Sequence, residues 1–257
     1  MKKLHFITVL FITLVLSTSL SAQNLKAHEQ NKKMSRGVNV LGYDKAFWKD
    51  YNNGRFKESY FKMIKDAGFS TIRVNLHTFS HMNSDYIIEP EWLDALDFIV
   101  KKGLEAKLMV ILDMHEFNAM ADDPVGKKEM FLAVWKQLAP RYKDQPDDLL
   151  FELLNEPNRK LSAEMWNSYL IEALNIVRET NPERTVIIGP GNWNGIESLD
   201  KLVLPENDKN IIVTVHFYHP MKFTHQGAPW ASEFKDITGV SCTGTQDEKN
   251  EMLTKIK

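Results

Sequence analysis

The dipeptide Asn155-Glu156 comes at the end of the apolar run 149–154, and Pro157 follows it. An apolar run of this kind is typical of a buried strand. A carboxyl group at its end is partly withdrawn from water, which suits it to act as a general acid. Pro157 ends strand pairing because it has no N–H and a fixed φ. The alternative interpretation is an ordinary strand end followed by a turn.

Polar and aromatic residues also stand near the ends of other apolar runs. We predict strands at residues 36–41, 71–76, 106–114, 149–155, 185–189 and 210–218. The residues near their C-terminal ends are Asn39, Arg73, Asn75, Asp113, His115, Glu116, Asn155, Glu156, Trp193, His216, Tyr218 and His219. In a parallel barrel these ends meet on one face, which is where such folds keep their chemistry. The side chains are therefore expected to form one site.

Helical patterns separate the predicted strands, near residues 56–68, 90–103, 130–138 and 165–181, and Gly68 and Gly103 are expected to end the first two. Alternating strands and helices predict an α/β fold with a parallel sheet and right-handed crossovers. A repeat of roughly 35 residues favours a (β/α)8 TIM barrel, which needs about 250 residues. The competing architecture is a doubly wound open sheet, but no G-x-G-x-x-G sequence is present.

Composition narrows the class of protein. The chain has 257 residues, of which 43% are hydrophobic, and a net charge of -2. It can therefore bury a large core, and it offers no electrostatic case for binding nucleic acid. Cys242 is the only cysteine, so no disulfide can form within the chain.

The N-terminus resembles a cleavable signal peptide at residues 1–22, with Lys2 and Lys3 before an apolar stretch and cleavage expected after Ala22. A membrane anchor is the alternative, although the stretch is short for a span. We expect a secreted or periplasmic protein with no membrane contact after cleavage. Residues 23–35 are predicted to be a flexible arm, and residues 36–257 a single domain.

Four segments carry a family resemblance over residues 36–235. They are Thr-Ile-Arg-Val-Asn at 71–75, Leu-Asp-Met-His at 112–115, Leu-Asn-Glu-Pro at 154–157 and Val-His-Phe-Tyr at 215–218. Together they resemble glycoside hydrolase family 5, the cellulase-like retaining (β/α)8 glycosidases. A further stretch, Phe-Thr-His-Gln-Gly-Ala-Pro-Trp at 223–230, resembles a loop found in some members of the same family. The resemblance implies an endo-acting hydrolase of β-1,4-linked glucan of the cellulose or glucomannan type. It implies no cofactor, and a monomer when complete.

The resemblance also implies roles for individual residues. Glu156 would be the general acid/base, and Asn155 would hydrogen-bond the sugar 2-hydroxyl. Arg73 and Tyr218 would lie against the catalytic nucleophile, and His216 would position the acid/base.

Further residues would contact the sugar chain. His115 would line the subsite at the cleavage point. Glu116 stands where several relatives have a second His, so it would alter a sugar contact or add a carboxylate to the rim. The remaining expected contacts are Asn39, Trp193, His225 and Trp230. A metal-dependent hydrolase is another reading, but no HExxH spacing supports it. Cellulose, mixed-linkage glucan, glucomannan, mannan and xyloglucan all stay open as substrates.

One expected element has no match in the sequence. Retention requires a second carboxylate about 5 Å from the first, and the family carries it on the seventh strand in a Gly-Glu-Phe-Gly type of segment. After His216 the sequence predicts only loop and then a helix that starts at a Thr245/Glu248 capping box. We therefore expect residues 36–257 to be the incomplete catalytic domain of a C-terminally truncated enzyme that is inactive by itself.

Several alternatives remain for that truncated chain. Asp113 and Glu116 are the available substitutes for the nucleophile, although both come from the strand beside that of Glu156. The other functional class is a non-catalytic carbohydrate-binding remnant. Glu152, a charge within an apolar strand, is expected to pair with Arg36 or Arg73.

Overall fold

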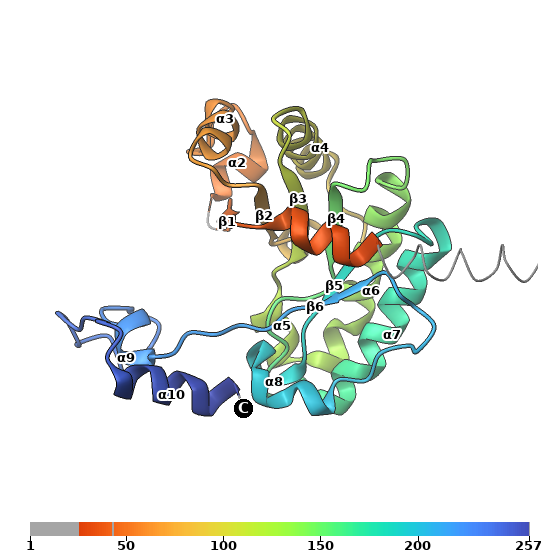
Figure 1. Cartoon of the computed structure of the whole chain (residues 1–257). Helices are drawn as coiled ribbons and strands as arrows, with labels where there is room; N and C mark the ends of the chain where they lie inside the picture. Colours follow the sequence, from red (N-terminus) through yellow and green to blue (C-terminus); the bar gives the residue numbers. More distant parts are fainter. Residues whose placement is uncertain (1–25, 43, 257) are drawn as a thin grey trace, which may run out of the picture.

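The computed structural model describes residues 26–42 and 44–256. Its centre is a parallel sheet of six strands in the order β1 to β6, as an incomplete (β/α)8 barrel requires (Figure 1). All six predicted strands are confirmed, and most are shorter than predicted. Their bounds are β1 Gly37–Val40, β2 Thr71–Leu76, β3 Met109–Met114, β4 Leu149–Glu152, β5 Val186–Ile188 and β6 Ile211–Val213. The predicted signal peptide at residues 1–22 lies outside the described residues.

Strand register sorts the inward-facing side chains into layers, because alternate residues of a strand face the same side. The pairing Asn75 with Asp113, Asp113 with Glu152, and Glu152 with Ile187 defines the layer nearest the C-terminal ends. The layer below it contains Asn39, Arg73, Ile111 and Leu150. Charged residues thus occupy the barrel interior directly below the strand ends.

The outer face of the sheet packs against amphipathic helices, chiefly α4 (Pro90–Glu105), α6 (Pro124–Arg141) and α7 (Ala163–Thr180). The prediction that Gly103 ends its helix is wrong, because α4 continues to Glu105. A Cβ on Gly103 would lie 2.7 Å from Val110 Cγ2, so this glycine permits close packing of helix on strand. The shorter elements are α2 (Lys45–Lys49), α3 (Ser59–Asp66), η1 (Phe79–His81), α5 (Phe117–Asp122), α8 (Gly191–Asn194) and η2 (Ile196–Lys201).

Residues 26–34 form a helix, so the prediction of a flexible arm over residues 23–35 is wrong for this part. Lys26 and Lys33 form ion pairs with Asp147 and Asp148, which precede β4. Met34 packs on the interior apolar cluster that includes Ile111 and Ile187. These contacts fix the helix across the N-terminal end of the barrel.

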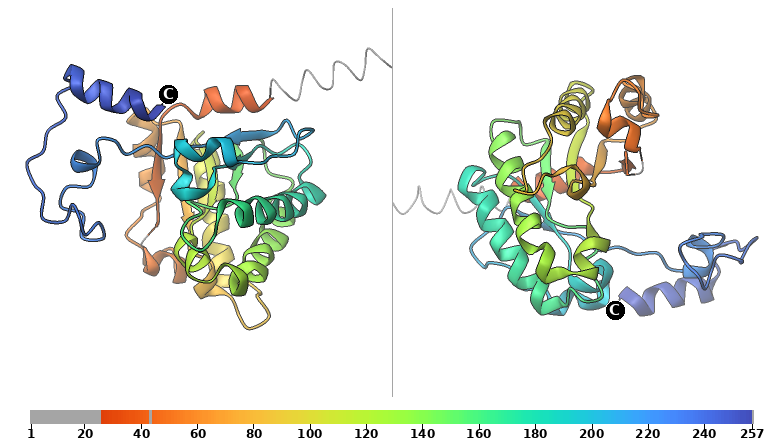
Figure 2. Two further views of the ribbon diagram at one scale, coloured as in Figure 1. Left: turned by 90° about the horizontal axis from the view of Figure 1, so that it is seen from below. Right: turned by 180° about the vertical axis from the view of Figure 1, so that it is seen from behind.

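The chain leaves the sheet after β6 and forms an arm that extends away from the barrel in every view (Figures 1 and 2). The arm carries α9 (Met221–Thr224) and α10 (Gln246–Ile256). The predicted capping box is confirmed, since the Glu248 carboxylate accepts from the Thr245 N–H at 2.8 Å and Thr245 Oγ1 accepts from the Glu248 N–H at 3.3 Å. Within residues 26–42 and 44–256, none of the helices has the length and apolar character needed to cross a bilayer.

Candidate active site

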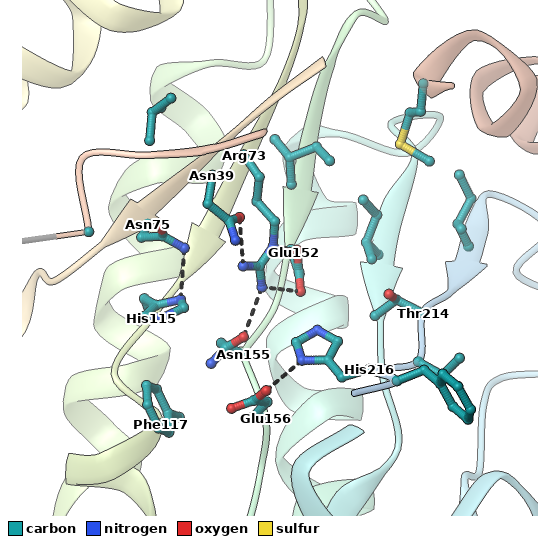
Figure 3. Close-up of a pocket in the computed structure, with 18 of the residues that line it drawn as sticks. Asn39, Arg73, Asn75, His115, Phe117, Glu152, Asn155, Glu156, Thr214 and His216 are labelled. Atoms are coloured by element: carbon teal, nitrogen blue, oxygen red, sulfur yellow. Dashed lines mark hydrogen bonds and ion pairs between the residues drawn. The ribbon is translucent and has the colours of Figure 1, made fainter. Parts of the chain in front are cut away.

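A cavity of about 880 Å³ opens at the C-terminal ends of the strands and runs into the barrel interior (Figure 3). Glu156 lies at its edge, and Glu156 Oε1 is 2.6 Å from His216 Nδ1. The two residues come from segments that follow β4 and β6, so the pairing of β4, β5 and β6 in one sheet brings them together. The backbone N–H of His216 donates in turn to the Asn194 carbonyl at 2.9 Å, which holds His216 in place.

The backbone around Glu156 is strained and firmly held. Glu156 has φ +42°, a left-handed conformation that costs about 1–3 kcal/mol for a residue other than glycine. The Asn155 N–H donates to the Met114 carbonyl at 2.9 Å, which continues the pairing with β3 beyond the last residue of β4. On the other side, the Trp193 N–H donates to the Pro157 carbonyl at 3.0 Å. These bonds fix the direction in which the carboxylate points.

Arg73 occupies the centre of the cavity floor and is nearly buried (Figure 3). Its Nε and Nη2 donate to the two oxygens of Glu152 at 2.7 and 2.8 Å, so the prediction of a Glu152–Arg73 pair is confirmed. The same Nη2 donates to Asn155 Oδ1 at 2.9 Å, and Nη1 donates to Asn39 Oδ1 at 3.2 Å. Arg73 therefore orients the amides of two expected sugar contacts while it neutralises a buried carboxylate.

A second buried carboxylate, Asp113, lies beside Arg73. Arg73 Nη1 is 3.0 Å from Asp113 Oδ2, and the same oxygen receives Asn75 Nδ2 at 2.9 Å and His115 Nδ1 at 2.5 Å. His115 lines the cavity. Its ring also meets those of His77 and Phe117 edge-on, with centroids 5.3 and 5.2 Å away.

Burial and neighbouring charges shift the pKa values of the two carboxylates that share Arg73 in opposite directions. Burial by itself would raise the pKa of Asp113, but Arg73 and His115 hold that pKa below its ordinary value. Burial, followed by the charge of Asp113, raises the pKa of Glu152. Burial and the nearby Glu156 carboxylate raise the pKa of Tyr218.

The structure brings most of the predicted contacts to this cavity. Besides those described above, Asn39, Tyr218 and Trp230 line it, and Trp230 is highly exposed. Trp193 and His225 are not among its lining residues. Trp193 lies on the rim with its ring centroid 6.1 Å from that of Phe117, and the His225 ring is 5.1 Å from that of Tyr218.

Glu116 does not reach the cavity. Its carboxylate accepts from the Phe79 N–H at 2.7 Å and is partly buried, which raises its pKa. The expectation of a rim carboxylate or sugar contact at Glu116 is therefore wrong for this structure, because the side chain ties the strand end to η1. Asp113, the other proposed substitute nucleophile, is fully buried and already bonded to three groups.

Two residues of the site, Phe117 and Asn194, were missing from the predicted set, and a third, Asn75, was predicted to lie at a strand end but was given no role. Asn75 lies two residues after Arg73 on β2, so both side chains face the barrel interior. This spacing can be read from the sequence. Phe117 lines the cavity from the start of α5, and the sequence carried no signal for it. Asn194 Nδ2 lies 3.4 Å from His216 Nε2 and depends on the unusual backbone of α8. Among the described residues, no group of three or more His, Cys, Asp or Glu side chains is arranged to hold a metal ion.

A parallel α/β barrel with a carboxylate, an amide and two histidines at the C-terminal ends of its strands defines a hydrolase-like class of site. The sequence matches Cellulase (glycosyl hydrolase family 5) over residues 27–256. The chain belongs to this family, and the predicted resemblance is confirmed.

Individual relatives agree with this assignment. Endoglucanase H of Acetivibrio thermocellus is 31% identical over 81% of this chain, and endoglucanase 3 of Fibrobacter succinogenes is 30% identical over 77% of it. The chain spans only 23% and 33% of the lengths of these two proteins. The solved endoglucanase Cel5A of Thermotoga maritima is 37% identical, with a TM-score of 0.82 over 89% of this chain and 74% of that one. Cel5A has also been solved with cellobiose and with mannotriose.

Proposed function

We propose that this chain carries the acid/base side of a retaining endo-β-1,4-glucanase site. The observation that supports this most directly is the contact of 2.6 Å between Glu156 and His216, beside Asn155 and Arg73 on the cavity floor. Glu156 would protonate the glycosidic oxygen and then activate water in the second half-reaction. Family membership and the endoglucanase names of the relatives favour β-1,4-glucan as substrate.

The contacts of the other residues suit the roles that the family implies. The Asn155 amide oxygen accepts from Arg73, so its NH2 group is left to donate to the sugar 2-hydroxyl. Arg73 and Tyr218 would face the nucleophile, and His115, Asn39 and Trp230 would contact the sugar within the cavity. Trp193 and His225 would contact the chain further along the rim. A glucomannan substrate is compatible with Cel5A, which was solved with both cellobiose and mannotriose.

The nucleophile is the part that the described residues do not supply. The carboxylates that line the described cavity are Glu152 and Glu156, and Arg73 binds both oxygens of Glu152. We propose that a strand added beside β6 carries the nucleophile, and that the chain as given does not hydrolyse glycans. The non-catalytic alternative keeps the same aromatic and histidine contacts and binds glycan without turnover.

Rescue by azide tests the proposal on the chain as it stands. Azide would attack the anomeric carbon of an aryl β-cellobioside from the open face, the bond to the aryl oxygen would break, and Glu156 would give its proton to the leaving phenolate. The products would be α-cellobiosyl azide and a phenol. We expect no product in buffer alone and a measurable rate with azide.

The variant Glu156→Gln identifies the acid. It should slow the rescued reaction about 10²–10⁴-fold for a phenyl leaving group and much less for 2,4-dinitrophenyl, which needs no protonation. Glu179→Gln, on the exposed surface of α7, is the matched control and should leave the rate unchanged. Equal phenyl rates for Glu156→Gln and the control would refute the role of Glu156. Hydrolysis in buffer alone would refute the proposal that the chain lacks its nucleophile. Glycan binding without rescue by azide would favour the non-catalytic alternative.

A further inference from the structure

Asp113 is a buried carboxylate that the proposed reaction does not use. It is fully buried and does not line the cavity, so it cannot touch a substrate there. Its Oδ2 nevertheless collects Arg73 Nη1 at 3.0 Å, Asn75 Nδ2 at 2.9 Å and His115 Nδ1 at 2.5 Å. Of these three partners, His115 is the one whose hydrogen-bonding character depends on where a proton sits.

The geometry assigns that proton. An ionised carboxylate only accepts hydrogen bonds, so a contact of 2.5 Å requires an N–H on His115 Nδ1. Asn75 Nδ2 donates to Asp113 and also lies 3.0 Å from this nitrogen, but a second amide N–H directed there would leave the shorter contact between His115 Nδ1 and the carboxylate without a proton. A neutral imidazole with its proton on Nδ1 leaves Nε2 as an acceptor.

We propose that Asp113 is a positioning residue that fixes His115 in the Nδ1–H tautomer, so that His115 accepts a hydrogen bond from a sugar hydroxyl in the cavity. The identity of the donor as a sugar rests on the proposed function, while the tautomer does not. Asn155 has the opposite polarity, because its oxygen is occupied by Arg73 and its NH2 group is left to donate. His115 would thus accept a hydrogen bond from one sugar hydroxyl, and Asn155 would donate a hydrogen bond to another.

A purely structural role for Asp113 makes a different prediction. In that case the carboxylate would serve only to neutralise Arg73, and its removal would leave the His115 tautomer unchanged. The tautomer therefore separates the two roles without any enzymatic assay.

Long-range 1H–15N NMR on the full chain with 15N-labelled histidine measures the tautomer directly. The chain has eight histidines, and loss of one signal set in His115→Gln assigns the residue. At pH 8 we expect the Nδ1–H pattern for His115. An Nε2–H pattern in the wild-type protein would overturn the proposal.

Two substitutions test the dependence on Asp113. Asp113→Asn keeps an oxygen that can accept from Nδ1–H and should preserve the tautomer, whereas Asp113→Leu offers no acceptor and should release His115 to the Nε2–H form. Glu116→Gln is the matched control, since that carboxylate lies on the same segment but binds the Phe79 N–H instead of His115, and the tautomer should not change. Retention of Nδ1–H in a folded Asp113→Leu protein would overturn the proposal. If circular dichroism shows that this variant does not fold, the wild-type and Asp113→Asn spectra still decide, and Nε2–H in either one overturns it.

Calorimetric titration with cellotriose links the tautomer to binding. Asp113→Asn should bind within about threefold of the wild-type affinity, and Asp113→Leu should lose about tenfold, as expected for one hydrogen bond lost to a wrong tautomer. Equal affinity of all three proteins would refute the contact between His115 and the sugar. An Nδ1–H tautomer in a wild-type chain that binds no cellotriose would refute the glycan substrate and leave the positioning role standing.

Discussion

Replacement of Arg73 by Met should strongly lower the stability of the protein, because it removes the cation that pairs with the buried carboxylates of Glu152 and Asp113. Arg73 binds Glu152 through two hydrogen bonds and lies 3.0 Å from Asp113, and both carboxylates are almost completely buried. The methionine keeps most of the apolar stem but leaves two buried carboxylates without a cation. Removal of one partner from a buried pair costs about 3–5 kcal/mol, because the remaining charge is unpaired and desolvated.

Urea unfolding followed by circular dichroism measures this cost. The control is Arg141→Met, since Arg141 makes a similar two-pronged contact with Asp97 but on the partly exposed surface. Exposed pairs are screened by water, so the control should cost about 0.2–1 kcal/mol. The two Arg variants therefore differ mainly in the burial of the carboxylates that they leave behind.

The pH dependence gives a second check with a defined sign. In the wild type the pKa of Asp113 is lowered, so its contribution to stability is present at neutral pH and is lost as the pH falls through the folded-state value. Without Arg73 the pKa of Asp113 should rise above its unfolded value, and that of Glu152, which burial already raises, should rise further, so the variant should gain relative stability on acidification. The difference between wild type and Arg73→Met should therefore shrink from pH 7.5 to pH 5. A cost at pH 7.5 as small as that of the control, or a difference that grows at pH 5, would refute the reasoning.

Three other substitutions have clear expected outcomes. Burial lowers the pKa of His77 to about 4, so the unfolded chain binds more protons than the native one between pH 6.5 and 4, and His77→Gln should flatten the loss of stability over that range in urea titrations. Glu116→Gln should keep the Phe79 contact and be neutral or slightly stabilising at pH 7, because burial disfavours the ionised carboxylate. Gly189→Ala would place a Cβ 2.4 Å from the buried Asn194 side chain and should cost about 1–3 kcal/mol, visible as a lower Tm.

The sequence by itself determined the architecture. Short apolar runs separated by amphipathic stretches permit few arrangements other than parallel strands covered by helices, and all six predicted strands are present. It also placed Asn155, Glu156 and His216 at one end of the barrel, because that end collects the C-termini of every strand. Where local signals are ambiguous the predictions failed. Gly103 continues a helix because it packs on Val110, and residues 26–34 form a helix docked through Met34.

Only the tertiary structure decided how the polar side chains pair. The sequence left Glu152 between Arg36 and Arg73, and the strand register selects Arg73 because both side chains face the interior. The direction of Glu116 depends on where η1 crosses the end of β3, which strand parity does not specify. Hydrogen bonds between residues far apart in the chain depend on distances of a few tenths of an ångström. Such distances are fixed by the packing of the whole sheet, so they appear only once the strands are placed side by side.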